Sequence, residues 1–105
     1  MLTNLKSWLE TTGMKAAEEL FKTPPALPYI VFRDSRNVYG SDESNLLAVR
    51  NVAIELYSDT IHAAAESSIE ALLNAKAYPF TKHREWIPSE SFFMTVFEFQ
   101  TTERK

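Results

Sequence analysis

The chain of 105 residues contains no cysteine and only two glycines. Without cysteine it forms no disulfide, offers no thiolate ligand to a metal ion and has no thiol nucleophile. With so little glycine it cannot build the glycine-rich loops that hold phosphate groups in nucleotide-binding proteins. These two absences exclude several large classes of redox protein and nucleotide-dependent enzyme.

Strongly basic segments and long apolar runs are also missing. The formal net charge is -3 at pH 7, and the only basic cluster is Lys82, His83 and Arg84. Proteins that bind nucleic acid usually gather lysine and arginine on one face, so we expect no nucleic-acid sequence recognition. No apolar run approaches the roughly 20 residues that span a bilayer, and the N-terminus does not resemble a signal peptide. We therefore expect no membrane partner, and a location in the cytoplasm where the chain is made or in a particle assembled there.

What the sequence does contain is a large apolar fraction of 45%, with seven Phe, four Tyr and two Trp. This is enough for one packed core, and the length fits a single domain over residues 1–105. A domain of this size cannot hide every aromatic side chain. We therefore expect some of them at a protein–protein interface, where such residues are enriched.

Hydrophobic periodicity predicts a short helix at the N-terminus, over residues 3–12, with Thr3 as its N-cap and Gly13 at its end. The next segment, residues 14–21, is ambiguous. Its residues are good helix formers, but they also alternate in a pattern that suits an extended chain. The residues alone leave both conformations open.

A polar segment over residues 33–44 is rich in turn-forming residues and predicts a long loop. The other predicted elements are strands over 29–32, 46–57, 80–86 and 92–99, a helix over 61–76, and a frayed tail over 101–105. The order predicts an α+β fold, with two helices packed on one face of a mostly antiparallel four- to five-stranded sheet. The strand over 92–99 has apolar residues on both faces and belongs in the middle of the sheet or against a partner.

Histidines and acidic loop residues give little sign of chemistry. His62 and His83 are the only imidazoles, and their polar surroundings favour solvated surface positions. The acidic residues of segment 33–44 match no metal-binding motif and indicate turn formation instead. We expect no metal and no cofactor.

Glu55 and Glu98 are the best acid–base candidates, because both interrupt apolar strands. The simpler interpretation is that each carboxylate lies on an exposed face beside a cation such as Arg33 or Arg50. We favour this interpretation and expect no catalytic site.

Several short runs are similar to one known family. They are LPYIVF at residues 27–32, YGSD at 39–42 and VAIELY at 52–57, with Thr12-Gly13 and the strand 92–99 in matching places. In these runs the chain resembles the small tail-completion proteins, also called tail-terminator or head–tail joining proteins, of long-tailed phages and prophages of Gram-positive bacteria. The match covers most of the chain, but each motif is short and none is catalytic.

The resemblance implies a small α+β subunit that forms a ring, commonly six-fold. Such a ring ends the tail tube and presents a surface to the head connector, so the implied partners are other copies of the chain, the tail-tube protein and the connector. The resemblance also implies that residues 14–21 are extended.

A ring needs two different contact patches on each subunit. The long loop expected over residues 33–44 can project as an interaction arm. Aromatic side chains beyond those needed for the core are expected at a contact surface as well. The candidate interface residues are Arg33, Asp34, Arg36, Asn37, Val38, Tyr39, Trp86, Phe92 and Phe99.

Three functions are therefore weighed. The first, which we expect, is a structural role in virion assembly. The second is a small non-catalytic protein-binding or regulatory α+β domain, either a monomer or a dimer. The third is an enzyme that uses Glu55, Glu98 or a histidine in a pocket shared between subunits.

Overall fold

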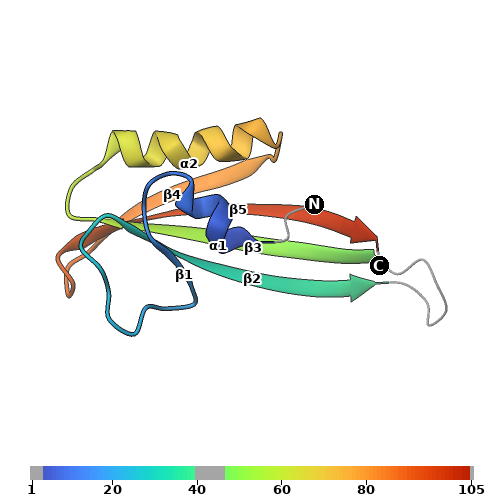
Figure 1. Cartoon of the computed structure of the whole chain (residues 1–105), viewed down its shortest axis with the longest axis horizontal. Coiled ribbons are helices and arrows are strands. Elements are labelled where there is room, and N and C mark those ends of the chain that lie inside the picture. Colours follow the sequence, from blue (N-terminus) through green and yellow to red (C-terminus); the bar gives the residue numbers. More distant parts are fainter. Residues whose placement is uncertain (1–3, 40–46, 105) are drawn as a thin grey trace.

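The computed structural model describes residues 4–39 and 47–104, and Figure 1 shows it as a long sheet with two helices. The predicted α+β class is confirmed. The elements, in chain order, are α1 (Leu5–Glu10), β1 (Ala16–Glu18), β2 (Tyr29–Tyr39), β3 (Leu47–Ser58), α2 (Ala63–Ala75), β4 (Phe80–Ile87) and β5 (Phe92–Arg104).

The five strands form one sheet in the order β1-β2-β3-β5-β4. The sheet is mixed rather than purely antiparallel, since β1 pairs with β2 in parallel and the other three pairs are antiparallel. Strand β5 lies between β3 and β4. The strand therefore lies inside the sheet, as the apolar residues on both of its faces predicted.

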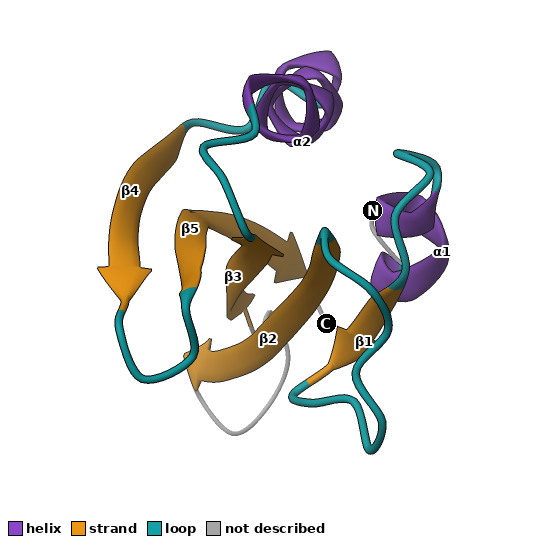
Figure 2. Ribbon diagram, turned by 90° about the vertical axis from the view of Figure 1, so that its left-hand side faces the viewer, coloured by secondary structure: helices purple, strands orange, loops and turns teal. Residues whose placement is uncertain are grey.

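The hydrophobic core lies between the sheet and the helices, and both views show α1 and α2 on the same side of the sheet (Figures 1 and 2). Alternate strand residues point toward this side, as the period of two requires. We call the opposite side the open face. The fully buried members of the core, at 0% exposure, are Leu9, Ile30, Ile54, Leu56, Ile69, Leu73 and Phe97.

Helix α1 is shorter than the predicted span 3–12. Asn4 is its N-cap, since its Oδ1 accepts a hydrogen bond from the Ser7 amide at 3.0 Å. The helix ends at Glu10, and Gly13 follows with a φ of 91°, in the left-handed region. The predicted cap, Thr3, lies outside the described residues.

The ambiguous segment 14–21 contains a strand, as the family resemblance implied. Ala16–Glu18 pairs in parallel with the start of β2, and Ala16 is 1% exposed. Glu19 then adopts a φ of 68° and ends the strand. Local helix propensity is worth only tenths of a kcal/mol per residue, so pairing with β2 and burial override it.

The predicted loop over 33–44 is wrong for residues 33–39, which belong to β2. They pair with β3 without interruption as far as Tyr39 opposite Leu47. The polar residues there have low strand propensity, but the continuous backbone ladder determines the conformation. The frayed tail predicted over 101–105 is also wrong for residues 101–104, which continue β5 opposite β3. Residues 40–44 lie outside the described part of the chain.

The two outer strands stop before the inner three do. Pairing of β1 ends opposite Phe32, and pairing of β4 ends opposite Phe99. Beyond these points β2, β3 and β5 continue together toward the right of Figure 1. We call this part, made of residues 35–39, 47–51 and 100–104, the tongue. The rest of the sheet, with both helices, is the base.

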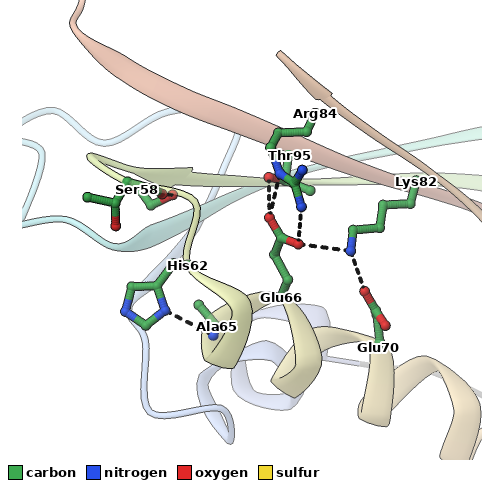
Figure 3. Close-up of polar contacts among 9 residues, drawn as sticks. Ser58, His62, Ala65, Glu66, Glu70, Lys82, Arg84 and Thr95 are labelled. Carbon is green, nitrogen blue, oxygen red and sulfur yellow. Dashed lines mark hydrogen bonds and ion pairs between the residues drawn. The ribbon is translucent and has the colours of Figure 1, made fainter. Parts of the chain in front are cut away.

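Helix α2 begins at Ala63, later than the predicted start at Ile61, and ends at Ala75. Ile61, the first residue of the predicted helix, precedes α2 and is 57% exposed. His62 is the N-cap, and its Nδ1 accepts a hydrogen bond from the Ala65 amide at 3.1 Å (Figure 3). Among the described residues, no helix is long and apolar enough to cross a membrane.

Candidate interaction surfaces

A largely buried ion pair lies where the tongue meets the base. The Arg50 guanidinium binds the Asp34 carboxylate through Nε, at 3.0 and 3.1 Å, and through Nη2, at 2.8 Å. The Arg50 side chain is 5% exposed and that of Asp34 is 17% exposed. Asp34 was predicted as an interface residue in a loop. Instead it lies in β2 and binds an arginine of β3.

The tongue carries small polar side chains. Ser35, Asn51 and Gln100 lie side by side on the open face, one on each strand. The Gln100 side-chain amide donates to Asn51 Oδ1 at 2.7 Å. Of the predicted interface residues, Arg36 and Asn37 are exposed. Val38 and Tyr39 lie in β2, but their side chains are outside the described part of the structure.

Arg33, another predicted interface residue, is bound to two carboxylates on the open face. Its Nε lies 3.1 Å from Glu55 and its Nη1 lies 2.6 Å from Glu19. The pKa of the Arg33 guanidinium is raised, mainly because it donates a hydrogen bond to Glu55. Glu55 therefore lies beside a cation, as the simpler interpretation predicted, but its side chain is only 12% exposed and so does not have the predicted exposed position. Glu98 is exposed, and beside it lies a shallow depression of about 480 Å³ around Ala53.

A row of aromatic rings crosses the open face of the base. The centroids of Phe21, Tyr29, Tyr57 and Phe92 follow one another at 5.4, 5.3 and 5.0 Å. Burial, followed by the hydrogen bond to Glu55, raises the pKa of Tyr57 well above its ordinary value. Phe92, a predicted interface residue, is half-buried in this row. The row lines a groove of about 310 Å³.

Trp86 is 45% exposed on the edge strand β4, in agreement with its predicted surface position. Its ring packs edge-on against Phe93, with a centroid distance of 4.8 Å. Phe99 differs, because it is 4% exposed and stacks on Tyr78 at 5.0 Å. The expectation of an exposed Phe99 is wrong, since Tyr78 and Trp8 cover it on the helix side.

Lys82 and Arg84 of β4 face two acidic residues of α2 (Figure 3). The buried Glu66 carboxylate accepts hydrogen bonds from Arg84 at 2.6 and 2.9 Å and from the Thr95 hydroxyl at 3.2 Å. Lys82 lies 2.8 Å from Glu66 and 2.7 Å from Glu70. Hydrogen bonding from Arg84 outweighs burial and lowers the pKa of Glu66 to about 2. These contacts join α2 to β4 and β5.

Sequence reasoning missed this cluster, although a signal was present. Glu66 and Glu70 are four residues apart and so share one face of a helix, and Lys82 and Arg84 are two apart and so share one face of a strand. His83, on the other face of β4, is 71% exposed, in agreement with the prediction of a solvated histidine.

Among the described residues, no group of three or more His, Asp or Glu side chains is arranged to hold a metal ion.

No protein-family model matches the chain, and no curated protein matches it significantly. Among solved structures, the fold is similar to that of a chain in the virion of a native gene transfer agent (GTA) particle. The TM-score is 0.66, and the alignment covers 92% of this chain and 84% of the other chain. At 17% sequence identity, this is a likeness of fold.

Proposed function

We propose that this protein is a structural component of a phage-like particle. In this proposal it assembles as a ring at the head-proximal end of the tail, ends the tail tube and joins the tube to the head. The observation that carries the proposal is the likeness of fold, over 92% of the chain, to a component of a GTA virion. The runs at 27–32 and 52–57, which resemble phage tail-completion proteins, support the same role.

The shape of the subunit supports assembly. The tongue extends past the helices in the long direction of a molecule that measures 49 × 28 × 22 Å. The base has an aromatic row on its open face and the exposed Trp86 at its edge. The subunit thus has contact surfaces that differ in position and chemistry, which a ring needs on each subunit.

The proposal involves no catalysis. Glu55 is held by Arg33 and by the Tyr57 hydroxyl, and Glu66 is held by its two cations. His62 caps a helix with its side chain. Each of these groups therefore has a structural partner.

The proposed partners are other copies of the chain, commonly six in a ring, together with the tail-tube protein and the head connector. The proposed location is the virion tail, after assembly in the host cytoplasm. The polar tongue suits a wet contact that forms late, whereas the aromatic base suits a drier one.

The test is deletion of the gene from the cell that produces the particle. We expect DNA-filled heads without tails, and free tails of irregular length, in negative-stain micrographs. Expression of the wild-type chain from a plasmid restores intact particles, and a specific antibody labels the head–tail joint. Normal particles after deletion would contradict the proposal and favour the small regulatory domain.

A further inference from the structure

The tongue has two open strand edges, and they lie at the same level. On its outer side, β2 loses its partner after Phe32, where β1 stops. On the opposite side, β5 loses its partner after Phe99, where β4 stops. Among the described residues, segments 35–39 and 100–104 therefore pair only with β3, which lies between them. Each segment has a line of backbone donors and acceptors available to another strand.

The two edges run in the same direction. Tyr39 and Arg104 lie opposite the same residue, Leu47, so β2 and β5 both run from the base to the tip of the tongue. If a second copy stands beside the first in the same orientation, the β2 edge of one lies parallel to the β5 edge of the other. This contact joins two different surfaces and can be repeated from copy to copy, as a ring requires.

The chemistry of the tongue edges suits such a contact. Edge strands that avoid pairing usually carry charges or end at prolines. Strand β4 has these features, with Lys82, His83, Arg84 and Glu85 in succession between Pro79 and Pro88. In contrast, residues 37–39 and 100–102 are uncharged, and the charges of the two tongue edges stand next to these runs, at Arg36 and at Glu103 and Arg104.

The partner that fits is another copy of the chain. Ser35, Asn51 and Gln100 form a polar row across the open face, and Gln100 already donates to Asn51 at 2.7 Å. A second copy in the same orientation places its Ser35 beside Gln100, which continues the row. Cross-strand polar pairs of this kind stabilise sheets.

We propose that copies of the chain assemble by parallel pairing of residues 35–39 of one copy with residues 100–104 of the next. The sheet of each tongue then continues into that of its neighbour, with all helices on one wall of the assembly. The bases must spread apart, because β1 of one copy and β4 of the next both lie between the two paired strands there. This inference rests on the ring proposed above and names its subunit contact.

The absence of native cysteine makes disulfide trapping a clean test. Asn37 and Thr102 are both exposed, share the open face and lie opposite the same residue, Val49. We expect the full-length variants Asn37→Cys and Thr102→Cys to form a covalent dimer when mixed and oxidised, and neither to do so alone. A chain that carries both Asn37→Cys and Thr102→Cys should give a ladder of covalent oligomers on a non-reducing gel. The largest of them contains as many subunits as the ring. The pair Asn37→Cys and Gln100→Cys covers a stagger of the two strands by two residues, since Asn37 lies opposite Val49 and Gln100 lies opposite Asn51.

A second measurement uses charge. We expect the double variant Asn37→Lys and Gln100→Lys to lose the oligomer in light scattering while its unfolding midpoint is unchanged. His83→Lys, on the edge of β4, is the matched control and keeps the oligomer. His83→Cys mixed with Asn37→Cys is expected to give no covalent dimer.

Each other result overturns the pairing. If rings are seen in micrographs but no cysteine combination forms a disulfide, the tongue edges are not the subunit contact. The proposed ring itself then stands. A covalent dimer of Asn37→Cys alone indicates two-fold pairing of β2 with itself, which cannot close a ring. A protein that stays monomeric at every concentration and in the particle removes both the pairing and the ring.

Discussion

The base and the tongue share the strands β2, β3 and β5 but are stabilised differently. In the base, helices cover one face of the sheet, and Ile54 and Phe97 pack against them with 0% exposure. In the tongue, Ser35, Asn37 and Gln100 are exposed. The base therefore has a hydrophobic core, whereas the described side chains of the tongue make polar contacts on a continuous backbone ladder.

This difference separates two tasks that one small domain must perform. Burial of apolar side chains is the dominant favourable contribution to folding, and the base supplies it. Among the described side chains of the tongue, Ser35, Asn37, Gln100 and Thr102 are exposed, and we propose that this region contacts other subunits. Its attachment to the base is strengthened by the ion pair between Arg50 and Asp34. The predictions below test whether the two regions are as distinct in energy as they are in structure.

The largest effect is expected in the base, from Phe97→Ala. Phe97 is fully buried, and its replacement by alanine leaves a cavity that costs about 3–5 kcal/mol of unfolding free energy. Urea denaturation followed by circular dichroism measures it. The matched tongue variant is Val49→Ala, at a half-buried position of β3, which we expect to cost about 1 kcal/mol or less. Equal losses would contradict the separation of the two regions.

The second effect is expected at the junction, from Arg50→Met. The variant leaves Asp34 largely buried without this cation, and removal of one partner of such a pair costs about 2–4 kcal/mol. The double variant Arg50→Met and Asp34→Leu removes both charges and is expected to recover most of the loss. If the double variant is as unstable as the single one, packing rather than the unpaired charge is responsible.

The third effect is expected from Glu66→Gln, where α2 meets β4. The pKa of Glu66 is lowered to about 2, against about 4.3 in an unfolded chain, so loss of the charge costs about 1–3 kcal/mol at pH 7. Thermal unfolding at pH 7 measures this loss. Glu70→Gln is the control, because Glu70 is more exposed and contacts only Lys82 among the described residues; we expect less than about 1 kcal/mol.

The same carboxylate gives a pH dependence with a definite sign. Because its folded-state pKa is depressed, the stabilisation is complete above about pH 4.3 and is lost as the pH falls through about 2. Between these values the unfolded chain binds a proton that the folded one does not. The difference in unfolding free energy between wild type and Glu66→Gln should therefore shrink across this window. A constant difference would show that Glu66 acts through packing alone.

The base was more predictable from sequence than the tongue. Its helices and strands contain apolar residues at helical or alternating spacing, as in Val52, Ile54 and Leu56. The β2 part of the tongue has no such pattern, because Ser35, Arg36 and Asn37 are polar in succession. Residues 33–37 therefore looked like a loop, and only the pairing of β2 with β3 makes them a strand.

The candidate interface was predictable only in part. Exposure of Trp86 was expected because the chain has more aromatic side chains than its core can hold. Phe99 is also a large aromatic residue, but it is buried. The difference depends on Trp8 and Tyr78, which cover Phe99 from segments distant in the sequence. Alternation along a strand gives the face of a residue but not what lies above that face. The open edges were likewise unpredictable, because they depend on where β1 and β4 stop.

The smallest effect is expected in the tongue, from Gln100→Ala. The variant removes the hydrogen bond to Asn51, but both side chains are accessible to water, so we expect a loss of at most about 0.5 kcal/mol. Thr95→Ala is the matched variant on the same strand. Thr95 is 0% exposed and donates to Glu66, so about 1–2 kcal/mol should be lost there. Urea denaturation compares the two. If Gln100→Ala costs as much as Thr95→Ala, the polar row is part of what holds the subunit together. If it costs little alone but weakens the oligomer, the row acts mainly between copies.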